Sequence, residues 1–229
     1  MLSKEFLIER GYCCGHGCLM CPYVPKHIKG NMIMNKNEVL IVCALEAETQ
    51  GQLEDWNVLY TGVGKINATM NLVDRLSDYN YVKPKLIINY GTAGSHKYNK
   101  GEFVDCTRFR QRDMDVSVLG FKRGETPFEK TPPTMIEMET DFNPIGKNEI
   151  CNTGDSFVKD GKEYTQGFQS EVLDMEAYAL AKVCYHYNVP FISFKYITDG
   201  ADERGADDWE ENVGKGIVKF KEKILNLLK

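Results

Sequence analysis

The stretch of sequence that decides the fold is LDMEAYALAKVCYHYNVPFISFKYITDGAD, at residues 173–202. Around its first half, between Glu171 and Asn188, apolar residues recur every three or four positions, which is typical of one buried face of a helix; they are Val172, Met175, Ala179, Val183 and Tyr187. The apolar run at residues 191–197 then indicates a strand that is buried on both faces. A helix followed at once by a buried strand predicts an α/β unit.

The same alternation of strands and helices continues toward the N-terminus. The apolar run Val39–Ala44 predicts a buried strand, and Gly62-Val63-Gly64 predicts a tight turn that opens a helix. Further strands are expected at residues 56–60, 86–90 and 114–121, a long loop at 122–148, and an amphipathic helix at 207–228. Strands that alternate with helices predict a three-layer α/β/α fold around a central mixed twisted sheet.

Composition and charge exclude several classes of protein. The chain has 229 residues, of which 42% are hydrophobic and 27% charged, so it is long enough to bury a substantial core. Its formal net charge of -5 argues against nucleic acid as the main partner. No apolar run approaches the roughly 18 residues that a membrane helix needs, and Met1–Arg10 lacks the apolar segment of a secretion signal. We therefore expect a cytoplasmic protein that does not associate with membranes.

The eight cysteines divide the chain into two regions. Residues 1–31 form a cysteine-rich module, which contains Cys13, Cys14, Cys18 and Cys21, and residues 36–229 form a second domain with a regular hydrophobic pattern. In a reducing cytosol a disulfide framework is not expected. The remaining cysteines are scattered, and we expect them to be buried, inert thiols: Cys43, Cys106, Cys151 and Cys184.

The cysteine-rich module predicts a metal site, and it resembles a small uncharacterised module of short bacterial and eukaryotic proteins. Its four thiolates, which lie within nine residues, could bind Zn²⁺ tetrahedrally, or three of them could hold an iron–sulfur cluster. Because the adjacent Cys13 and Cys14 are awkward ligands for one ion, His16 is an alternative ligand. The spacing of Cys14, Cys18 and Cys21 is that of the cluster loop in radical SAM enzymes, but the large barrel of those enzymes is absent. Free thiols in a compact loop, or a disulfide, remain alternatives.

Acidic and small residues follow the ends of the predicted strands. Ligands of α/β sheets bind beyond the carboxyl ends of the strands, so three segments are candidates for a binding site: ALEAE at 44–48, NYGTAG at 89–94 and TDGAD at 198–202. A fourth candidate is DMEA at 174–177, at the start of the predicted helix. Taken singly, each has an ordinary structural explanation, such as a solvated loop acid, a tight turn or a helix N-cap. Gly62 and Gly64 also lack the third glycine of a dinucleotide fingerprint.

Taken together and in order, six segments resemble one family: ALEAE (44–48), GVGKINA (62–68), INYGTAG (88–94), DVSVLGF (115–121), TGDSFV (153–158) and the stretch at 173–202. From about Val39 to the C-terminus, the chain resembles the nucleoside phosphorylase/nucleosidase superfamily, and most closely its 5′-methylthioadenosine/S-adenosylhomocysteine nucleosidases. The resemblance implies hydrolysis of the N-glycosidic bond of a purine nucleoside, with an adenine 5′-thio-nucleoside as the expected substrate. It also implies a homodimer and a reaction that needs no cofactor.

The resemblance further assigns roles to individual residues. Glycoside hydrolysis calls for an acid at the leaving group and a base for water; these roles fall to Asp199, at purine N7, and to Glu48. The substrate-binding residues that it implies are Glu176 at the ribose hydroxyls, Met175 under the sugar, Thr92 near the ribose and water, Phe157 stacked on the base, the Val158 backbone at the purine edge, and Trp209 against the 5′ substituent. Asp155, Lys195 and Thr198 are expected to support these groups, and Glu46 to be solvated or structural.

The sequence favours water over phosphate as the nucleophile. Phosphorylases of the superfamily bind the phosphate dianion with arginines, one of them just before the Gly-Thr turn, where this chain has Asn89. Glu48 occupies the neighbourhood of a second such arginine and would repel phosphate. Two alternatives stay open: a purine nucleoside phosphorylase, and a non-catalytic nucleoside-binding regulatory protein. The segment between Phe121 and Cys151 is shorter than is usual in the family, which leaves the 5′ specificity open.

Overall fold

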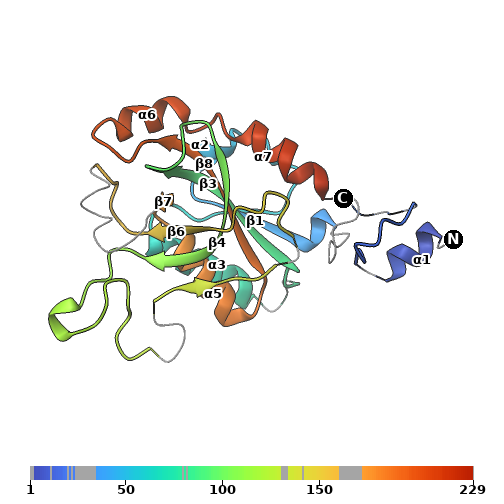
Figure 1. Cartoon of the computed structure of the whole chain (residues 1–229), viewed down its shortest axis with the longest axis horizontal. Helices are drawn as coiled ribbons and strands as arrows, with labels where there is room; N and C mark the ends of the chain where they lie inside the picture. The colour runs from blue at the N-terminus through green and yellow to red at the C-terminus, as the bar shows by residue number, and fades with distance from the viewer. Residues whose placement is uncertain are drawn as a thin grey trace.

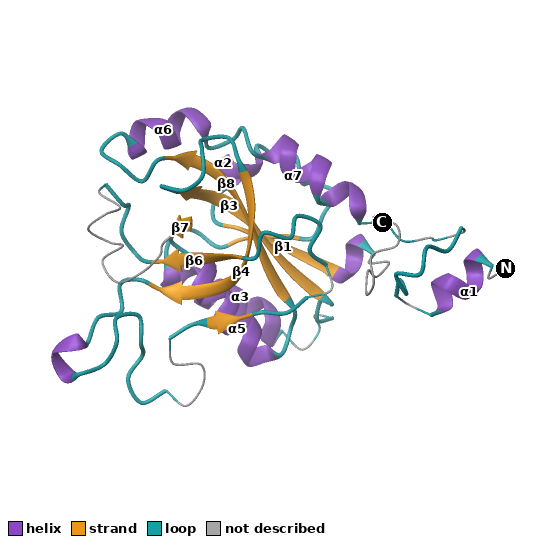
Figure 2. Cartoon of the chain, viewed as in Figure 1, coloured by secondary structure: helices purple, strands orange, loops and turns teal. Residues whose placement is uncertain are grey.

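The computed structural model describes residues 3–10, 12–19, 21, 23, 35–78, 80, 82–129, 134–140, 142–159 and 172–228. Its strands are β1 (Val39–Cys43), β2 (Val58–Tyr60), β3 (Leu86–Gly94), β4 (Phe103–Gln111), β5 (Ile136–Glu137), β6 (Glu149–Thr153), β7 (Val172–Asp174) and β8 (Phe191–Asp199). Its helices are α1 (Lys4–Glu9), α2 (Glu46–Thr49), α3 (Lys65–Ser77), α5 (Ala177–Tyr187), α6 (Gly205–Asn212) and α7 (Ile217–Lys223), with the short turns η1 (Lys36–Glu38), η2 (Ser117–Leu119) and η3 (Leu225–Leu227). Figures 1 and 2 show the strands at the centre of the domain with helices on both sides, which confirms the three-layer α/β/α prediction.

The strands form one mixed sheet that curls back on itself. β1 pairs in parallel with β2 and β3, and β3 pairs in parallel with β8. β8 is antiparallel to β4, whereas β4, β6 and β7 run parallel to one another. The ring closes where β7 meets the end of β3, so that Gly94 pairs with both Leu173 and Asp199. The C-terminal ends of β3, β7 and β8 therefore lie together.

Both faces of the sheet are buried, as β1 illustrates. Leu40 and Val42 belong to the core that α3 and α5 cover, whereas Val39, Ile41 and Cys43 belong to the core beneath α7. Successive side chains of a strand point to opposite faces, so a strand that is covered on both faces needs apolar residues at every position. This explains why the sequence of β1 is continuously apolar rather than alternating.

The structure corrects the predicted bounds of two helices. The main helix α5 begins at Ala177 rather than at Glu171, because Val172–Asp174 form strand β7 and the Asp174 carboxylate accepts hydrogen bonds from the N–H groups at the helix start. Glu171 itself lies outside the described residues. The C-terminal helix is divided into α6, α7 and η3, and the turn between the first two contains Gly214 and Gly216.

The prediction of a strand at residues 114–121 is wrong. These residues form a loop that contains the single turn η2, and the strand lies earlier, at β4. β4 carries no continuous apolar run, because Asp105, Arg108 and Arg110 interrupt it. Asp105 is nevertheless fully buried, where its carboxylate accepts hydrogen bonds from the Asn143 side chain and from two backbone N–H groups.

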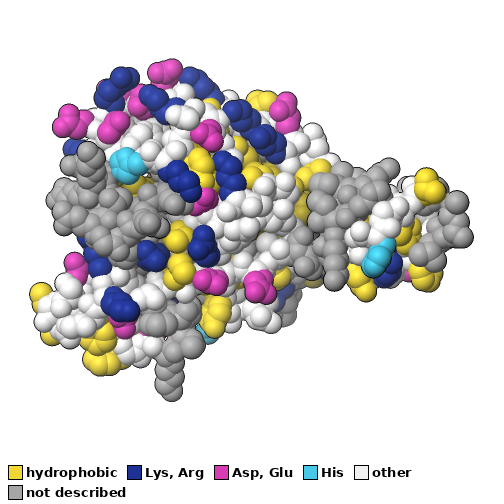
Figure 3. Space-filling view, viewed as in Figure 1, with side chains coloured by type: hydrophobic (Ala, Val, Ile, Leu, Met, Phe, Trp, Pro, Cys, Tyr) yellow, Lys and Arg dark blue, Asp and Glu magenta, His cyan; other side chains and the backbone are white. Residues whose placement is uncertain are grey.

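Among the helices that the structure describes, none is long and apolar enough to cross a membrane. Figure 3 shows Lys and Arg side chains interspersed with Asp and Glu over the visible face, rather than gathered in one basic patch.

Candidate active site

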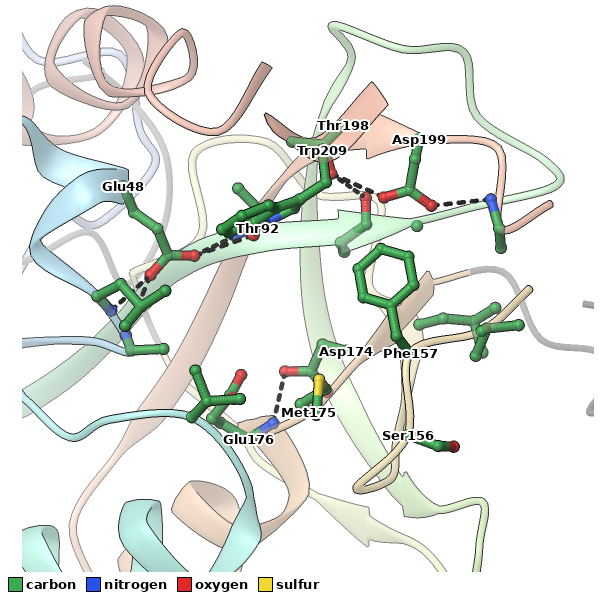
Figure 4. A pocket seen from close by; sticks show the side chains of 18 of the residues that line it. Glu48, Thr92, Ser156, Phe157, Asp174, Met175, Glu176, Thr198, Asp199 and Trp209 are labelled. Carbon is green, nitrogen blue, oxygen red and sulfur yellow. Dashed lines mark hydrogen bonds between the residues drawn. The ribbon is translucent and has the colours of Figure 1, made fainter. Parts of the chain in front are cut away.

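A pocket of about 230 Å³ opens where the C-terminal ends of β3, β7 and β8 meet. Figure 4 shows Glu48 and Asp199 at two ends of one side of this pocket, with Glu176 and Met175 across from them. All the residues to which the sequence assigned a catalytic or substrate-binding role line it: Glu48, Thr92, Phe157, Val158, Met175, Glu176, Asp199 and Trp209. The fold thus assembles these residues into one site from segments that are far apart in the sequence.

Glu48 is held by four hydrogen-bond donors. It lies on α2, directly after β1, and its side chain is buried. Its Oε2 accepts hydrogen bonds from the N–H groups of Ala44 and Leu45, both at 3.1 Å. Its Oε1 accepts from the Thr92 N–H at 2.8 Å and from the Thr92 hydroxyl at 3.0 Å. Both carboxylate oxygens are therefore fixed at the wall of the pocket, which suits a group that must orient water.

Trp209, on α6, contacts Thr92, the residue that donates to Glu48. Its indole Nε1–H donates a hydrogen bond to the Thr92 hydroxyl oxygen at 3.1 Å, and this hydroxyl in turn donates to Glu48. α6 is tied to the end of β8 by Asn212, whose Nδ2 donates to the Thr198 carbonyl at 3.3 Å. Sequence analysis placed Trp209 beside a 5′ substituent and did not foresee its hydrogen bond to Thr92.

Asp199, at the end of β8, is a buried acid. Its Oδ2 accepts a hydrogen bond from the Thr198 hydroxyl, and its Oδ1 accepts from the Ala201 N–H, both at 2.9 Å. Burial raises the pKa of Asp199, and these two donors oppose the rise only in part. Gly94 packs so closely on the carboxylate that a Cβ at this position would lie 2.5 Å from Oδ1. A carboxyl group with a raised pKa is suited to donate a proton near neutral pH.

Asp174 and Lys195 form a fully buried ion pair behind the pocket. The distance between Lys195 Nζ and Asp174 Oδ2 is 2.8 Å. Asp174 also accepts hydrogen bonds from the Thr153 hydroxyl at 2.5 Å and from the Ala177 N–H at 2.8 Å. Burial alone would raise the pKa of Asp174, but the charge of Lys195 and these donors outweigh burial and lower it. Asp174 therefore presents a negative charge beneath the site.

Glu176 is a second buried carboxylate, and its environment differs from that of Asp174. Its Oε1 accepts a hydrogen bond from the Gly64 N–H at 2.8 Å, at the start of α3. Burial, and then the negative charge of Asp174, raise the pKa of Glu176 to about 8. Gly64 has a φ of 92°, an angle that L side chains rarely adopt. The predicted glycine turn thus aims a backbone N–H at Glu176.

Phe157 and Val158 form the wall of the pocket near Asp199. The Phe157 ring is 40% exposed, and Figure 4 shows it facing into the pocket. Val158 is buried against Leu173 and Ala201. An aromatic ring that is accessible from a pocket can stack on a planar ring of a ligand.

Arg112 is a pocket residue that sequence analysis missed. It is only 1% exposed, and its guanidinium donates to the Ser156 hydroxyl at 3.1 Å and to the carbonyls of Gly154 and Ser156 at 3.0 and 2.5 Å. Its Cζ would lie 2.7 Å from a Cβ at Gly154, so only glycine permits this packing. Arg112 thus braces the loop that carries Phe157. Arginine is rarely buried, and Arg112 follows the strand β4 that the sequence did not reveal.

Asp155 holds the same loop from its other side, as the sequence predicted for a supporting residue. The Asp155 N–H donates to Asp113 Oδ2 at 2.9 Å, and Asp155 Oδ1 accepts from the Lys65 N–H at 2.8 Å. Lys65 Nζ in turn lies 2.6 Å from Asp113 Oδ1. These contacts join the loop to the start of α3, next to the Gly64 N–H that binds Glu176.

The charges around the pocket suit a neutral ligand better than a phosphate dianion. The pocket is lined by four carboxyl groups, those of Glu48, Asp174, Glu176 and Asp199. Of the nearby cations, Arg112 is bonded to the Gly154–Ser156 loop and Lys195 to Asp174. Asn89, the residue at the position of a phosphorylase arginine, is buried in the sheet: its Nδ2 donates to the Val42 carbonyl, and its Oδ1 accepts from the Ser193 hydroxyl.

The N-terminal cysteines lie in two pairs in the structure. The Sγ atoms of Cys13 and Cys21 are 3.8 Å apart, and those of Cys14 and Cys18 are 3.6 Å apart. Among the described residues, which include all four thiols, no group of three or more His, Cys, Asp or Glu side chains is placed to hold a metal ion. The expected zinc ion or iron–sulfur cluster therefore stays a prediction, as does the division of the chain at residues 31–36. The four scattered cysteines are buried, as predicted.

Comparison with known proteins places the chain in a family. The model of the phosphorylase superfamily matches residues 48–229. The 5′-methylthioadenosine/S-adenosylhomocysteine nucleosidase of Haemophilus influenzae is 30% identical over 196 residues, which cover 79% of this chain and 84% of that protein. The corresponding nucleosidase of Bacillus velezensis is 30% identical over 216 residues, which cover 85% and 89% of the two chains.

Solved structures agree on the fold. A Helicobacter pylori 5′-methylthioadenosine/S-adenosylhomocysteine nucleosidase in complex with a pyrrolidine inhibitor has a TM-score of 0.74 at 19% identity and covers 85% of this chain and 98% of its own. The futalosine hydrolase of the same organism has a TM-score of 0.73 at 19% identity and covers 83% and 97%. The chain therefore belongs to the phosphorylase superfamily, with 5′-methylthioadenosine/S-adenosylhomocysteine nucleosidases among its relatives.

Proposed function

We propose that this protein hydrolyses the N-glycosidic bond of a purine nucleoside and releases the free base. The observation that carries the proposal is that three of the four carboxyl groups that line the pocket lie in three different environments. Asp199 is buried with a raised pKa, Glu48 is fixed by four donors, and Glu176 accepts a backbone N–H across the pocket. Glycoside hydrolysis needs an acid and a base on opposite sides of the sugar carbon, and this site offers both.

In the proposed reaction, the bond between C1′ and N9 breaks and its electrons leave with the base. Asp199 donates its proton to purine N7, which neutralises the negative charge that develops on the leaving group. A water molecule forms the new bond to C1′ and gives one proton to Glu48. The products are a free base and a sugar with a hydroxyl at C1′, and solvent returns the proton from Glu48 to Asp199.

The other pocket residues suit the binding of a nucleoside. A carboxylate accepts hydrogen bonds with both oxygens, so Glu176 can bind neighbouring hydroxyls of the ribose while Met175 packs under the sugar. The accessible ring of Phe157 lies beside Asp199 in the pocket (Figure 4), which supports a stacking role on the base. The backbone of Val158 can read the purine edge, as the resemblance implies.

We propose an adenine 5′-thio-nucleoside as the substrate. Apolar side chains of Leu45, Val63 and Trp209 line the pocket together with Glu48, and they favour an apolar thioether over a charged 5′ group. The named activity of the relatives from Haemophilus influenzae and Bacillus velezensis supports the same choice.

We further propose that the protein forms a homodimer through α3. Ile66 and Met70 on this helix are 71% and 59% exposed, although both are large and apolar. They continue the apolar surface of Val63, which itself lines the pocket, so a second copy bound here would lie at the mouth of the site. Light scattering of the wild type and of Ile66→Glu tests this: a dimer that the substitution dissociates supports it, and a wild-type monomer at all concentrations refutes it.

The experiment that tests the function is base release from methylthioadenosine, S-adenosylhomocysteine, adenosine and inosine, each with and without phosphate. Adenine released without phosphate, fastest from a 5′-thio substrate, supports the proposal. Release only with phosphate would indicate a phosphorylase. Binding of a nucleoside without release of base in either buffer would indicate a regulatory protein.

A further inference from the structure

We infer that Trp209 is a positioning residue for the water base, because its indole N–H fixes the Thr92 hydroxyl as a donor to Glu48. The inference rests on the proposed hydrolysis. It assigns to Trp209 a role in the chemical step, in addition to the contact with a 5′ substituent that the family resemblance implies.

The direction of this hydrogen-bond chain follows from the chemistry of its members. An indole N–H can only donate, a carboxylate can only accept, and a hydroxyl has one hydrogen and two lone pairs. Trp209 Nε1 lies 3.1 Å from Thr92 Oγ1, which lies 3.0 Å from Glu48 Oε1. Trp209 therefore occupies one lone pair of the hydroxyl, and the hydroxyl hydrogen points at Glu48. One lone pair of Thr92 Oγ1 is left for a water molecule or a sugar hydroxyl.

The Thr92 hydroxyl is the weak point in the support of Glu48. Of the four donors to this carboxylate, three are backbone N–H groups of Ala44, Leu45 and Thr92, which the fold holds in place. The fourth is a hydroxyl, whose hydrogen rotates freely about its C–O bond. Without an outside partner, the hydroxyl can turn away from Glu48 and donate to the attacking water, and its hydrogen would then occupy the water lone pair that must attack C1′.

Trp209 is itself held rigidly enough to prevent this rotation. Its helix α6 begins at Gly205, where a Cβ would meet the Phe157 ring at 3.0 Å and Asp199 Oδ1 at 3.4 Å. One turn further along, Asp208 is buried and pairs with Lys100 at 2.9 Å. The indole is half-buried in the wall of the pocket, where exclusion of water strengthens its hydrogen bond.

The decisive variant is Trp209→Phe, which keeps an aromatic ring for the 5′ substituent but removes the donor. We expect kcat for methylthioadenosine to fall five- to tenfold, equivalent to about 1–1.4 kcal/mol, with KM within twofold of the wild type. Thr92→Val should lower kcat similarly, and the double variant should lose no more than the larger single loss, because both changes break one chain. Thr92→Ser, which keeps the hydroxyl, should recover most of the kcat that Thr92→Val loses.

Trp56→Phe is the matched control, because Trp56 is the other tryptophan of the chain and packs in the core beneath α7. A Trp209→Phe variant with unchanged kcat, or with a raised KM alone, would overturn the inference. Trp209 would then act only through the packing of its ring against the substrate. Additive losses in the double variant would also overturn it. A wild-type protein that releases no base from any nucleoside would overturn the proposed hydrolysis and this inference with it, whereas an active wild type with an unaffected variant overturns only the inference.

Discussion

Glu176 makes nucleoside affinity depend on pH in a direction that the structure fixes. Its pKa is raised to about 8 by burial and by the charge of Asp174. To accept hydrogen bonds from two ribose hydroxyls, Glu176 must be ionised, because the protonated acid uses one oxygen as a donor. With a pKa of about 8, roughly one Glu176 in eleven is ionised at pH 7. Binding at pH 7 then costs about 1.4 kcal/mol for deprotonation, or about tenfold in Kd.

The measurement is isothermal titration calorimetry of methylthioadenosine between pH 6 and pH 9.5. Asp199→Asn is the protein of choice, since it is expected to slow turnover and it removes the titration of Asp199. The account predicts that Kd falls about tenfold per pH unit below pH 8 and levels off above it, with close to one proton released per ligand at pH 7. A second substitution, Glu176→Gln, should bind more weakly and abolish the pH dependence. A Kd that is flat across this range, with no proton release, would refute the reasoning.

Four further predictions concern single changes. Glu176→Gln should stabilise the ligand-free protein, because the raised pKa of Glu176 makes its contribution to stability complete below pH 4.5 and causes that contribution to be lost as pH rises through about 8. The gain in the free energy of unfolding should reach on the order of 2–3 kcal/mol near pH 7 and vanish below pH 4.5. Thermal unfolding of the two proteins across pH measures it. Asp199→Asn should lower kcat by about 10²- to 10⁴-fold, as is typical for loss of a general acid, with ligand affinity within a few-fold; near-wild-type turnover by chromatography would remove Asp199 from the acid role. Arg112→Lys should raise KM by about tenfold with a smaller change in kcat, because the loss of about one hydrogen bond loosens the loop that carries Phe157. The control is Arg108→Lys, because the guanidinium of Arg108 donates to the Asn148 carbonyl instead. Deletion of residues 1–30 should leave turnover within a few-fold, because the pocket is lined by residues 44–209; a folded but inactive truncation would contradict this.

The acids of the site could be predicted because six ordered segments of the sequence resemble one family, and the positions of these acids near strand ends agree with that resemblance. Glu48 comes shortly after β1, Glu176 follows β7, and Asp199 ends β8. Strand ends that share one edge of a sheet bring such residues together. Strand β7 was nevertheless missed, because the sequence around it was predicted as the start of a helix at Glu171. The glycine turn at 62–64 was predicted from its two glycines before a helical pattern, although the hydrogen bond from Gly64 to Glu176 was not.

What the sequence did not reveal depends on contacts between distant segments. Arg112 acts on the loop at 154–156, and Trp209 acts on Thr92. Neither partner can be inferred from local spacing. Strand β4 was missed because the buried Asp105 and two half-buried arginines interrupt its apolar pattern. The burial of Asp105 is explained only by the donors that the loop at 143–148 supplies.

The central claim, that water attacks C1′ of a purine nucleoside, is tested most directly by turnover of methylthioadenosine in phosphate-free buffer made with ¹⁸O-labelled water. The account predicts that adenine is released and that mass spectrometry finds one labelled oxygen in the sugar product. Release of adenine only after phosphate is added, with a phosphorylated and unlabelled sugar, would contradict the account.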